Sequence, residues 1–169
     1  RFWFTARLKD GESKPHRKIL ASDLQDLPVL LIDDNDSALA ALAATLGSMG
    51  LAVDTCNDGA VGLARVKAAA DAGRDYALAL IDWQMPGWNG IETAERLQAL
   101  QLAKLPKLIL ITAFGREEAL HAARQAGFQA SLIKPINKSV LFETIASVLG
   151  QSELQERRES MEAHIRQLL

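Results

Sequence analysis

The stretch LIDWQMP at residues 80–86 is the most informative part of the sequence about the fold, because it joins an apolar run directly to a carboxylate and a loop. The run Ala77–Ile81 lacks the polar alternation of a half-exposed strand and is too short for a helix, which predicts a strand buried on both faces. Asp82 follows this run directly. In parallel sheets, sites form beyond the carboxyl ends of the strands, so Asp82 lies where chemistry is expected.

The same pattern of a short apolar run followed by an amphipathic stretch occurs five times along the chain. The expected strands are Val29–Ile32, Leu51–Thr55, Ala77–Ile81, Leu108–Ile111 and Ala130–Ile133. The expected helices are Ser37–Ser48, Gly59–Ala70, Ile91–Leu102, Glu117–Ala126 and Lys138–Leu149. Five such units with short loops predict an α/β fold, a doubly wound five-stranded parallel sheet with helices on both faces.

Five side chains follow the expected strands at the same edge of the sheet. Asp33 and Asp34 end the first strand, Asp82 the third, Thr112 the fourth and Lys134 the fifth. A single residue of this kind is often only a helix cap, a turn residue or a solvated charge. Five of them at successive strand ends are not explained by capping, and they predict a functional site.

The chemistry of this edge fits phosphoryl transfer. Crowded carboxylates raise one another's pKa unless a cation lies among them, and Mg²⁺ prefers such oxygen ligands together with a phosphate. Asp82 could then act as a nucleophile and form an aspartyl phosphate. Thr112 suits a hydrogen bond to a phosphoryl oxygen, and Lys134 supplies a compact positive charge there.

Residues 28–149 resemble the receiver domain of two-component response regulators. The motifs that carry the resemblance are LLIDDN at 30–35, LIDWQMP at 80–86 with Gly90, ITA at 111–113 and IKPI at 133–136. The resemblance implies a flavodoxin-like fold and a cytoplasmic signalling module of a phosphorelay. In such a module Asp82 takes a phosphoryl group from a phosphohistidine, and the domain catalyses its own phosphorylation and dephosphorylation.

The resemblance also implies how a Mg²⁺ ion is held. Asp34, Asp82 and the backbone carbonyl of Gln84 would bind the ion, while Asp33 would act mainly through water. A cis peptide bond is implied before Pro135.

Ser131 departs from the family pattern. Receivers often carry an aromatic switch residue three positions before the lysine, and here Ser131 occupies that position. We therefore expect phosphorylation to be normal and the conformational output to be weak or differently coupled.

The expected domain covers residues 28–150. The segments before and after it suggest a larger parent protein. FWFTARL at residues 2–8 resembles the last strand of a histidine-kinase ATP-binding domain, so residues 1–8 are expected to be its remnant and 9–27 a linker. The chain starts with Arg1 and not with Met, so we expect a piece of a longer protein, and the resemblance at residues 2–8 implies that this protein is a hybrid sensor histidine kinase. Residues 151–169 form an expected helix that links to a further module.

The expected partners are proteins of the same relay. They are the histidine-kinase dimerisation domain that carries the phosphohistidine and a histidine phosphotransfer domain. The expected C-terminal helix has Leu154, Met161 and Leu168 seven apart, a short pattern for a weak dimer. His164 on that helix lacks the bundle that a phosphotransfer domain needs, His16 and His121 lack metal-ligand partners, and Cys56 suits a buried filler.

Composition excludes several other classes. The 19 basic and 21 acidic residues give a net charge of −2, which argues against a nucleic-acid binder. The apolar runs are far shorter than the ~20 residues of a membrane helix, so membrane contact is expected only through the parent protein. One cysteine cannot form an internal disulfide, which fits a reducing cytoplasm.

Two other functions stay open at this point. A haloacid-dehalogenase-like phosphohydrolase also uses Asp, Thr, Lys and Mg²⁺, and Asp34-Asn35-Asp36 partly matches its D-x-D signature. That enzyme places its nucleophile after the first strand, whereas Asp82 follows the third. The other alternative is a protein-interaction domain that needs no phosphorylation, which Ser131 slightly favours.

Overall fold

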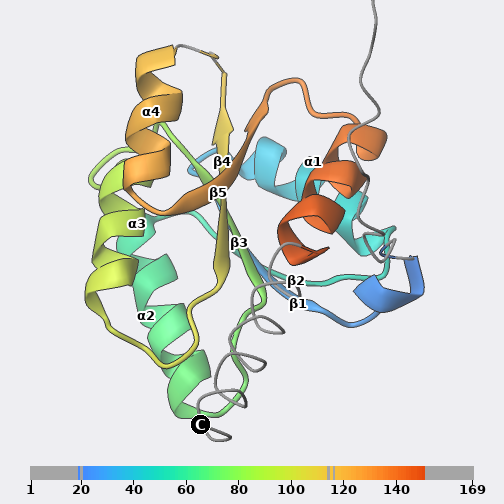
Figure 1. Cartoon of the computed structure of the whole chain (residues 1–169), viewed down its shortest axis with the longest axis horizontal. Coiled ribbons are helices and arrows are strands. Elements are labelled where there is room, and N and C mark those ends of the chain that lie inside the picture. Colours follow the sequence, from blue (N-terminus) through green and yellow to red (C-terminus); the bar gives the residue numbers. More distant parts are fainter. Residues whose placement is uncertain (1–18, 20, 114, 116, 151–169) are drawn as a thin grey trace, which may run out of the picture.

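A five-stranded parallel sheet forms the centre of the computed structural model, which describes residues 19, 21–113, 115 and 117–150 (Figure 1). The strand order is β2-β1-β3-β4-β5. This flavodoxin-like order confirms the predicted doubly wound fold. The strands are β1 Pro28–Ile32, β2 Ala52–Cys56, β3 Leu78–Asp82, β4 Lys107–Thr112 and β5 Phe128–Ile133.

Helices cover both faces of the sheet, as predicted. The numbered helices are α1 Asp36–Gly47, α2 Gly59–Asp71, α3 Gly90–Ala99 and α4 Glu117–Gln125, and residues 138–150 are also helical. Figure 1 shows α2, α3 and α4 on one side of the sheet, with α1 and the helix at 138–150 on the other. A short 3₁₀ helix, η1 Ala21–Leu24, precedes β1.

Alternate residues of the central strands build two hydrophobic cores. Leu31 and Leu80 pack with the helix at 138–150 through Leu141 and Ile145, while Ile32 and Ile81 belong to the opposite core. All five residues of β3 are buried, in agreement with the sequence. Strands β2 and β5 are partly exposed, because each lies at an edge of the sheet and has a neighbouring strand on one side only.

Two features differ from the expected organisation. Helix α3 ends at Ala99 and not at Leu102, because the chain turns sharply at Gln101, where φ is 49°. In the segment expected to be a linker, Leu24 is fully buried and Ile19 is nearly so, and both belong to the core beside β1.

Several predictions fall on residues that the structure does not describe. They are the kinase remnant at 1–8, the C-terminal helix at 151–169 with its dimer pattern, and the assignments of His16 and His164. The division of the chain into domains therefore stays a prediction. Among the described residues, no helix is long and apolar enough to cross a membrane.

Candidate functional site

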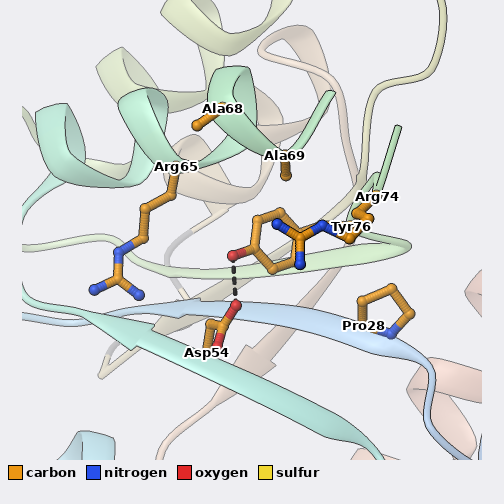
Figure 2. Close-up of a pocket in the computed structure, with 7 residues that line it drawn as sticks. All are labelled: Pro28, Asp54, Arg65, Ala68, Ala69, Arg74 and Tyr76. Atoms are coloured by element: carbon orange, nitrogen blue, oxygen red, sulfur yellow. Dashed lines mark hydrogen bonds between the residues drawn. The ribbon is translucent and has the colours of Figure 1, made fainter. Parts of the chain in front are cut away.

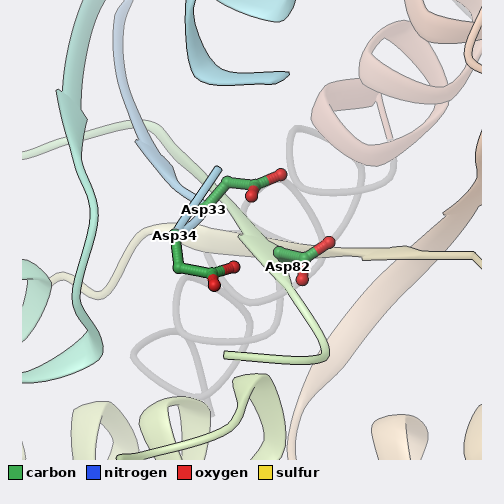
Figure 3. A group of neighbouring side chains, drawn as sticks. All are labelled: Asp33, Asp34 and Asp82. Atoms are coloured by element: carbon green, nitrogen blue, oxygen red, sulfur yellow. The ribbon is translucent and has the colours of Figure 1, made fainter. Parts of the chain in front are cut away.

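Three carboxylates meet at the carboxyl edge of the sheet. Asp33 and Asp34 directly follow β1, and Asp82 is the last residue of β3. These two strands are neighbours, with Ile32 opposite Ile81, so the sheet itself brings the carboxylates together. One oxygen from each of the three lies within 4.8 Å of the others (Figure 3).

Backbone amides of the adjoining loops hold two of these carboxylates. The N–H of Asn35 donates to Oδ1 of Asp33 at 2.9 Å, and the N–H of Gln84 donates to Oδ2 of Asp82 at 3.0 Å. Asn35 also caps α1, since its side chain accepts from the N–H of Ala38. The start of α1 and the loop after β3 are thereby joined to the cluster.

Lys134 closes the cluster from the end of β5. Its ammonium Nζ lies 2.9 Å from Oδ2 of Asp33 and 2.7 Å from Oδ1 of Asp82. The N–H of Lys134 donates to the carbonyl of Thr112, which fixes the end of β5 against the end of β4. The Lys134–Pro135 peptide bond is cis.

Burial makes the charges of this cluster interact strongly. Asp33 is 1% exposed and Asp82 is 6% exposed. Burial raises the pKa of Asp82 above its ordinary value and the charge of Asp33 adds to that rise, whereas Lys134 acts in the opposite direction. Burial alone lowers the pKa of Lys134, but its hydrogen bonds to Asp82 and Asp33 outweigh this effect and raise it.

The donor set fits a Mg²⁺ ion. Three carboxylates with a single ammonium leave a formal charge of −3 + 1 = −2 when all are ionised, which a divalent cation would balance. All the donors are hard oxygens, and Asp34 is exposed, so an ion there would keep several waters as Mg²⁺ prefers. The backbone carbonyl of Gln84 stays a predicted ligand.

Thr112 and Ser131 occupy neighbouring strands beside the cluster. Thr112 ends β4, is 2% exposed and lies opposite Ile133 of β5. Ser131 lies two residues earlier on β5, opposite Leu110, and is half-buried. Thr112 thus belongs to the same edge of the sheet as the carboxylates, whereas Ser131 lies two residues further from that edge, within β5.

The sequence predicts that these side chains lie at one edge of the sheet, but it does not predict the hydrogen bonds that orient them. The double contact of Lys134 with Asp33 and Asp82, and the amide donors of Asn35 and Gln84, were not predicted. A signal existed for Asn35, because an Asn just before a helical pattern is a typical N-cap. His121 is exposed on α4, where its ring lies beside Gln125, and it does not belong to the cluster.

Comparisons with known proteins agree with this geometry. A family model for the response regulator receiver domain matches residues 29–146. The chemotaxis protein CheY of Treponema pallidum is 34% identical over 122 residues, which cover 72% of this chain and 81% of that protein. The sensory/regulatory protein RpfC of Xanthomonas campestris pv. campestris is 28% identical over 127 residues, 74% of this chain but 17% of RpfC. A solved structure of CheY4 from Vibrio cholerae superposes with a TM-score of 0.65 at 26% identity, covering 72% of this chain and 97% of CheY4.

Proposed function

The chain belongs to the response regulator receiver domain family, and on that premise we propose that Asp82 accepts a phosphoryl group from a phosphohistidine. The main support is the ion pair between the buried Asp82 carboxylate and Lys134, which also contacts Asp33. This arrangement puts a carboxylate nucleophile next to a cation that can receive phosphoryl oxygens.

In the proposed step, a carboxylate oxygen of Asp82 attacks the phosphorus of the donor. An O–P bond forms, the N–P bond breaks, and the imidazole nitrogen leaves with the electron pair of that bond. Lys134 moves its contact from the carboxylate to the incoming phosphoryl oxygens, and the hydroxyl of Thr112 donates to one of them. Both groups stabilise negative charge that is spread over those oxygens.

The proposed function also includes a bound Mg²⁺ ion. Asp34, Asp82 and the backbone carbonyl of Gln84 would hold Mg²⁺, with Asp33 acting through water. When bound, Mg²⁺ supplies positive charge that screens the carboxylates from the phosphoryl oxygens. Asp33 keeps Lys134 in place through their ion pair.

We assign Ser131 to the switch position of the domain. Its side chain is too small to fill the space of an aromatic residue, so the conformational output would be transmitted differently from that of a receiver with an aromatic switch. The cis peptide bond before Pro135 stands beside Lys134 in the same loop. An interaction domain that works without phosphorylation is the second candidate, and the serine is the observation that favours it.

We propose that the parent protein is a hybrid sensor histidine kinase working in the cytoplasm, anchored to the membrane through its other parts. The similarity to RpfC supports a longer parent protein, because the matched region makes up only 17% of the length of RpfC. In this proposal residues 1–8 are a kinase remnant, 9–27 a linker, 28–150 the receiver and 151–169 a connecting helix. The partners are the kinase's phosphohistidine domain and a histidine phosphotransfer domain, and the connecting helix pairs weakly in a dimer.

The assignment of the nucleophile can be tested with Asp82→Asn and Asp34→Asn. Each variant is incubated with a ³²P-labelled phosphohistidine donor and Mg²⁺, and protein-bound label is measured after gel separation. We expect no label on Asp82→Asn and slow but detectable labelling of Asp34→Asn, whose role is only to hold the ion. The reverse pattern, with Asp34 essential as acceptor, would favour the phosphohydrolase arrangement with its nucleophile after the first strand.

A further inference from the structure

A second candidate site lies at the opposite end of the sheet from the acidic cluster. A hollow of about 420 Å³ opens between α2 and the amino ends of β1 and β3 (Figure 2). Pro28 begins β1 and Tyr76 precedes β3, whereas the acidic cluster follows the carboxyl ends of these strands. The five residues of β1 separate the two ends by about 16 Å. None of the residues of the acidic cluster lines the hollow.

A fixed polar pair forms the floor of this hollow. Tyr76 is 8% exposed, and its hydroxyl donates to Oδ2 of Asp54 on β2 at 2.6 Å (Figure 2). Burial and this contact with Asp54 raise the pKa of Tyr76 from 10.0 to about 12, still further above physiological pH, where the phenol is neutral. Tyr76 therefore adds no charge to the hollow, and it occupies one oxygen of Asp54.

Two arginines line the walls. Arg65 belongs to α2 and Arg74 to the segment between α2 and β3, and both are exposed. Figure 2 shows the guanidinium group of Arg65 to one side of the Tyr76 hydroxyl, and that of Arg74 overlapping the Tyr76 ring in this view. Within the described part of the chain, neither arginine forms an ion pair with a carboxylate. Their donors are thus available to a ligand.

The shape and charge of the hollow favour an anion. Two arginines and Asp54 give the lining a formal charge of +2 − 1 = +1, in a chain whose net charge is −2. Guanidinium groups bind phosphate and carboxylate through paired hydrogen bonds. Ala68 and Ala69 have small side chains that leave the space between the arginines open, and the volume lies within the roughly 300–1,000 Å³ of small-molecule sites.

We infer that this hollow binds a small organic anion with at least two negative groups, which contact Arg65 and Arg74. The groups are phosphates or carboxylates, since a guanidinium recognises both. Such a site is separate from phosphoryl transfer at Asp82 and gives the domain a second input.

The test uses inorganic pyrophosphate and citrate as probes. Each is titrated into the full chain in metal-free buffer at constant ionic strength, while backbone amide shifts are followed by NMR. We expect saturable shifts at Ala68, Ala69 and Tyr76, with at least tenfold weaker binding in both Arg65→Gln and Arg74→Gln. Lys67→Gln removes an exposed charge from the same helix outside the hollow, and it should bind as the wild type does.

The two probes separate the sources of the anion. Saturable binding of pyrophosphate alone supports a phosphorylated ligand, and binding of citrate alone supports a polycarboxylate. Ala68→Met, at an exposed position, fills the hollow without removing a charge and should also weaken binding. The inference is overturned if neither probe gives saturable shifts at these residues, or if Lys67→Gln weakens binding as much as the arginine variants do. Asp82→Asn should leave the affinity unchanged, which keeps this result independent of the phosphoacceptor.

Discussion

The ammonium of Lys134 lies 2.7 Å from the carboxylate of Asp82, although the two residues are 52 positions apart in the chain. The same ammonium contacts Asp33 at 2.9 Å, 101 positions away. Three strands, β1, β3 and β5, therefore meet through one cation at the carboxyl edge of the sheet. This contact joins the stability of the fold to the chemistry proposed for Asp82.

Removing the ammonium group of Lys134 should destabilise the folded chain. Lys134→Ala leaves Asp33 and Asp82 buried without their shared ion pair, which can cost about 3–5 kcal/mol for a fully buried pair. Because the Lys134 side chain is 34% exposed, we expect a smaller loss of roughly 1–3 kcal/mol in metal-free buffer. Urea denaturation measures it.

Two further variants serve as controls for the Lys134 prediction. Lys67→Ala, at an exposed position of α2, should leave the unfolding midpoint unchanged. Adding Asp82→Asn to Lys134→Ala should recover part of the lost stability, because it removes one of the two unpaired charges. If the double variant is less stable than Lys134→Ala alone, charge pairing does not explain the loss.

Thr112 should affect the rate of phosphorylation through its hydroxyl. Thr112→Ala removes the donor proposed for a phosphoryl oxygen, and loss of one such donor typically slows a reaction by about 10²-fold. Thr112→Ser keeps a hydroxyl at the same position and should stay close to the wild-type rate. The rate of labelling from a phosphohistidine donor distinguishes the two variants. Equal rates for alanine and serine would remove Thr112 from the proposed mechanism.

Gly90 should be sensitive to a single added methyl group. A Cβ there would lie 2.6 Å from the carbonyl oxygen of Asp82 and 3.0 Å from Cα of Trp83, both backbone atoms. We expect Gly90→Ala to lower the free energy of unfolding by about 1–3 kcal/mol and to slow phosphorylation, since the end of β3 must move. Gly47→Ala is the matched control: a Cβ at that helical position meets nothing within 4 Å. It should leave stability unchanged or raise it by up to about 1 kcal/mol.

Much of this architecture could be predicted from the sequence because local patterns determine it. The runs at β1, β3 and β4 are almost wholly apolar, so their burial on both faces follows from the sequence. Their central place in the sheet is seen only in the structure. Asp82 is the last residue of its strand, and Asp33 and Lys134 directly follow theirs. Parallel pairing brings these strand ends to one edge.

The remaining features of the fold and the site depend on contacts that no local sequence pattern predicts. The hydrogen bond from Tyr76 to Asp54 joins a loop to an edge strand, and neither residue stands in a recognisable motif. Leu24 packs into the core from a polar segment that resembles a linker. Lys134 could be placed at the correct edge, but its choice of partners depends on the distances between three strands.

Tyr76 gives a pH dependence that can be measured directly. Its pKa rises from 10.0 to about 12 in the folded chain, so the folded state favours the neutral phenol. This preference contributes up to roughly 2 kcal/mol to the free energy of unfolding. The contribution is fully present below pH 10 and is lost as the pH rises toward 12. Tyr76 is the single tyrosine of the sequence, so absorbance of the tyrosinate reports its ionisation without interference.

The control for this pH dependence is Tyr76→Phe. This variant should lose less stability between pH 10 and 12 than the wild type does. A tyrosinate absorbance that appears near pH 10 in the folded chain would contradict the hydrogen bond from Tyr76 to Asp54.

The most direct measurement is the intact mass of the chain after incubation with Mg²⁺ and acetyl phosphate, for the wild type and for Asp82→Asn. We predict that the wild type gains the mass of one phosphoryl group, and that the gain disappears in Asp82→Asn and when a chelator removes the metal. The added mass should also be lost on treatment with hydroxylamine, as expected for an acyl phosphate. A phosphoryl group that remains in Asp82→Asn would contradict the assignment of Asp82 as the acceptor.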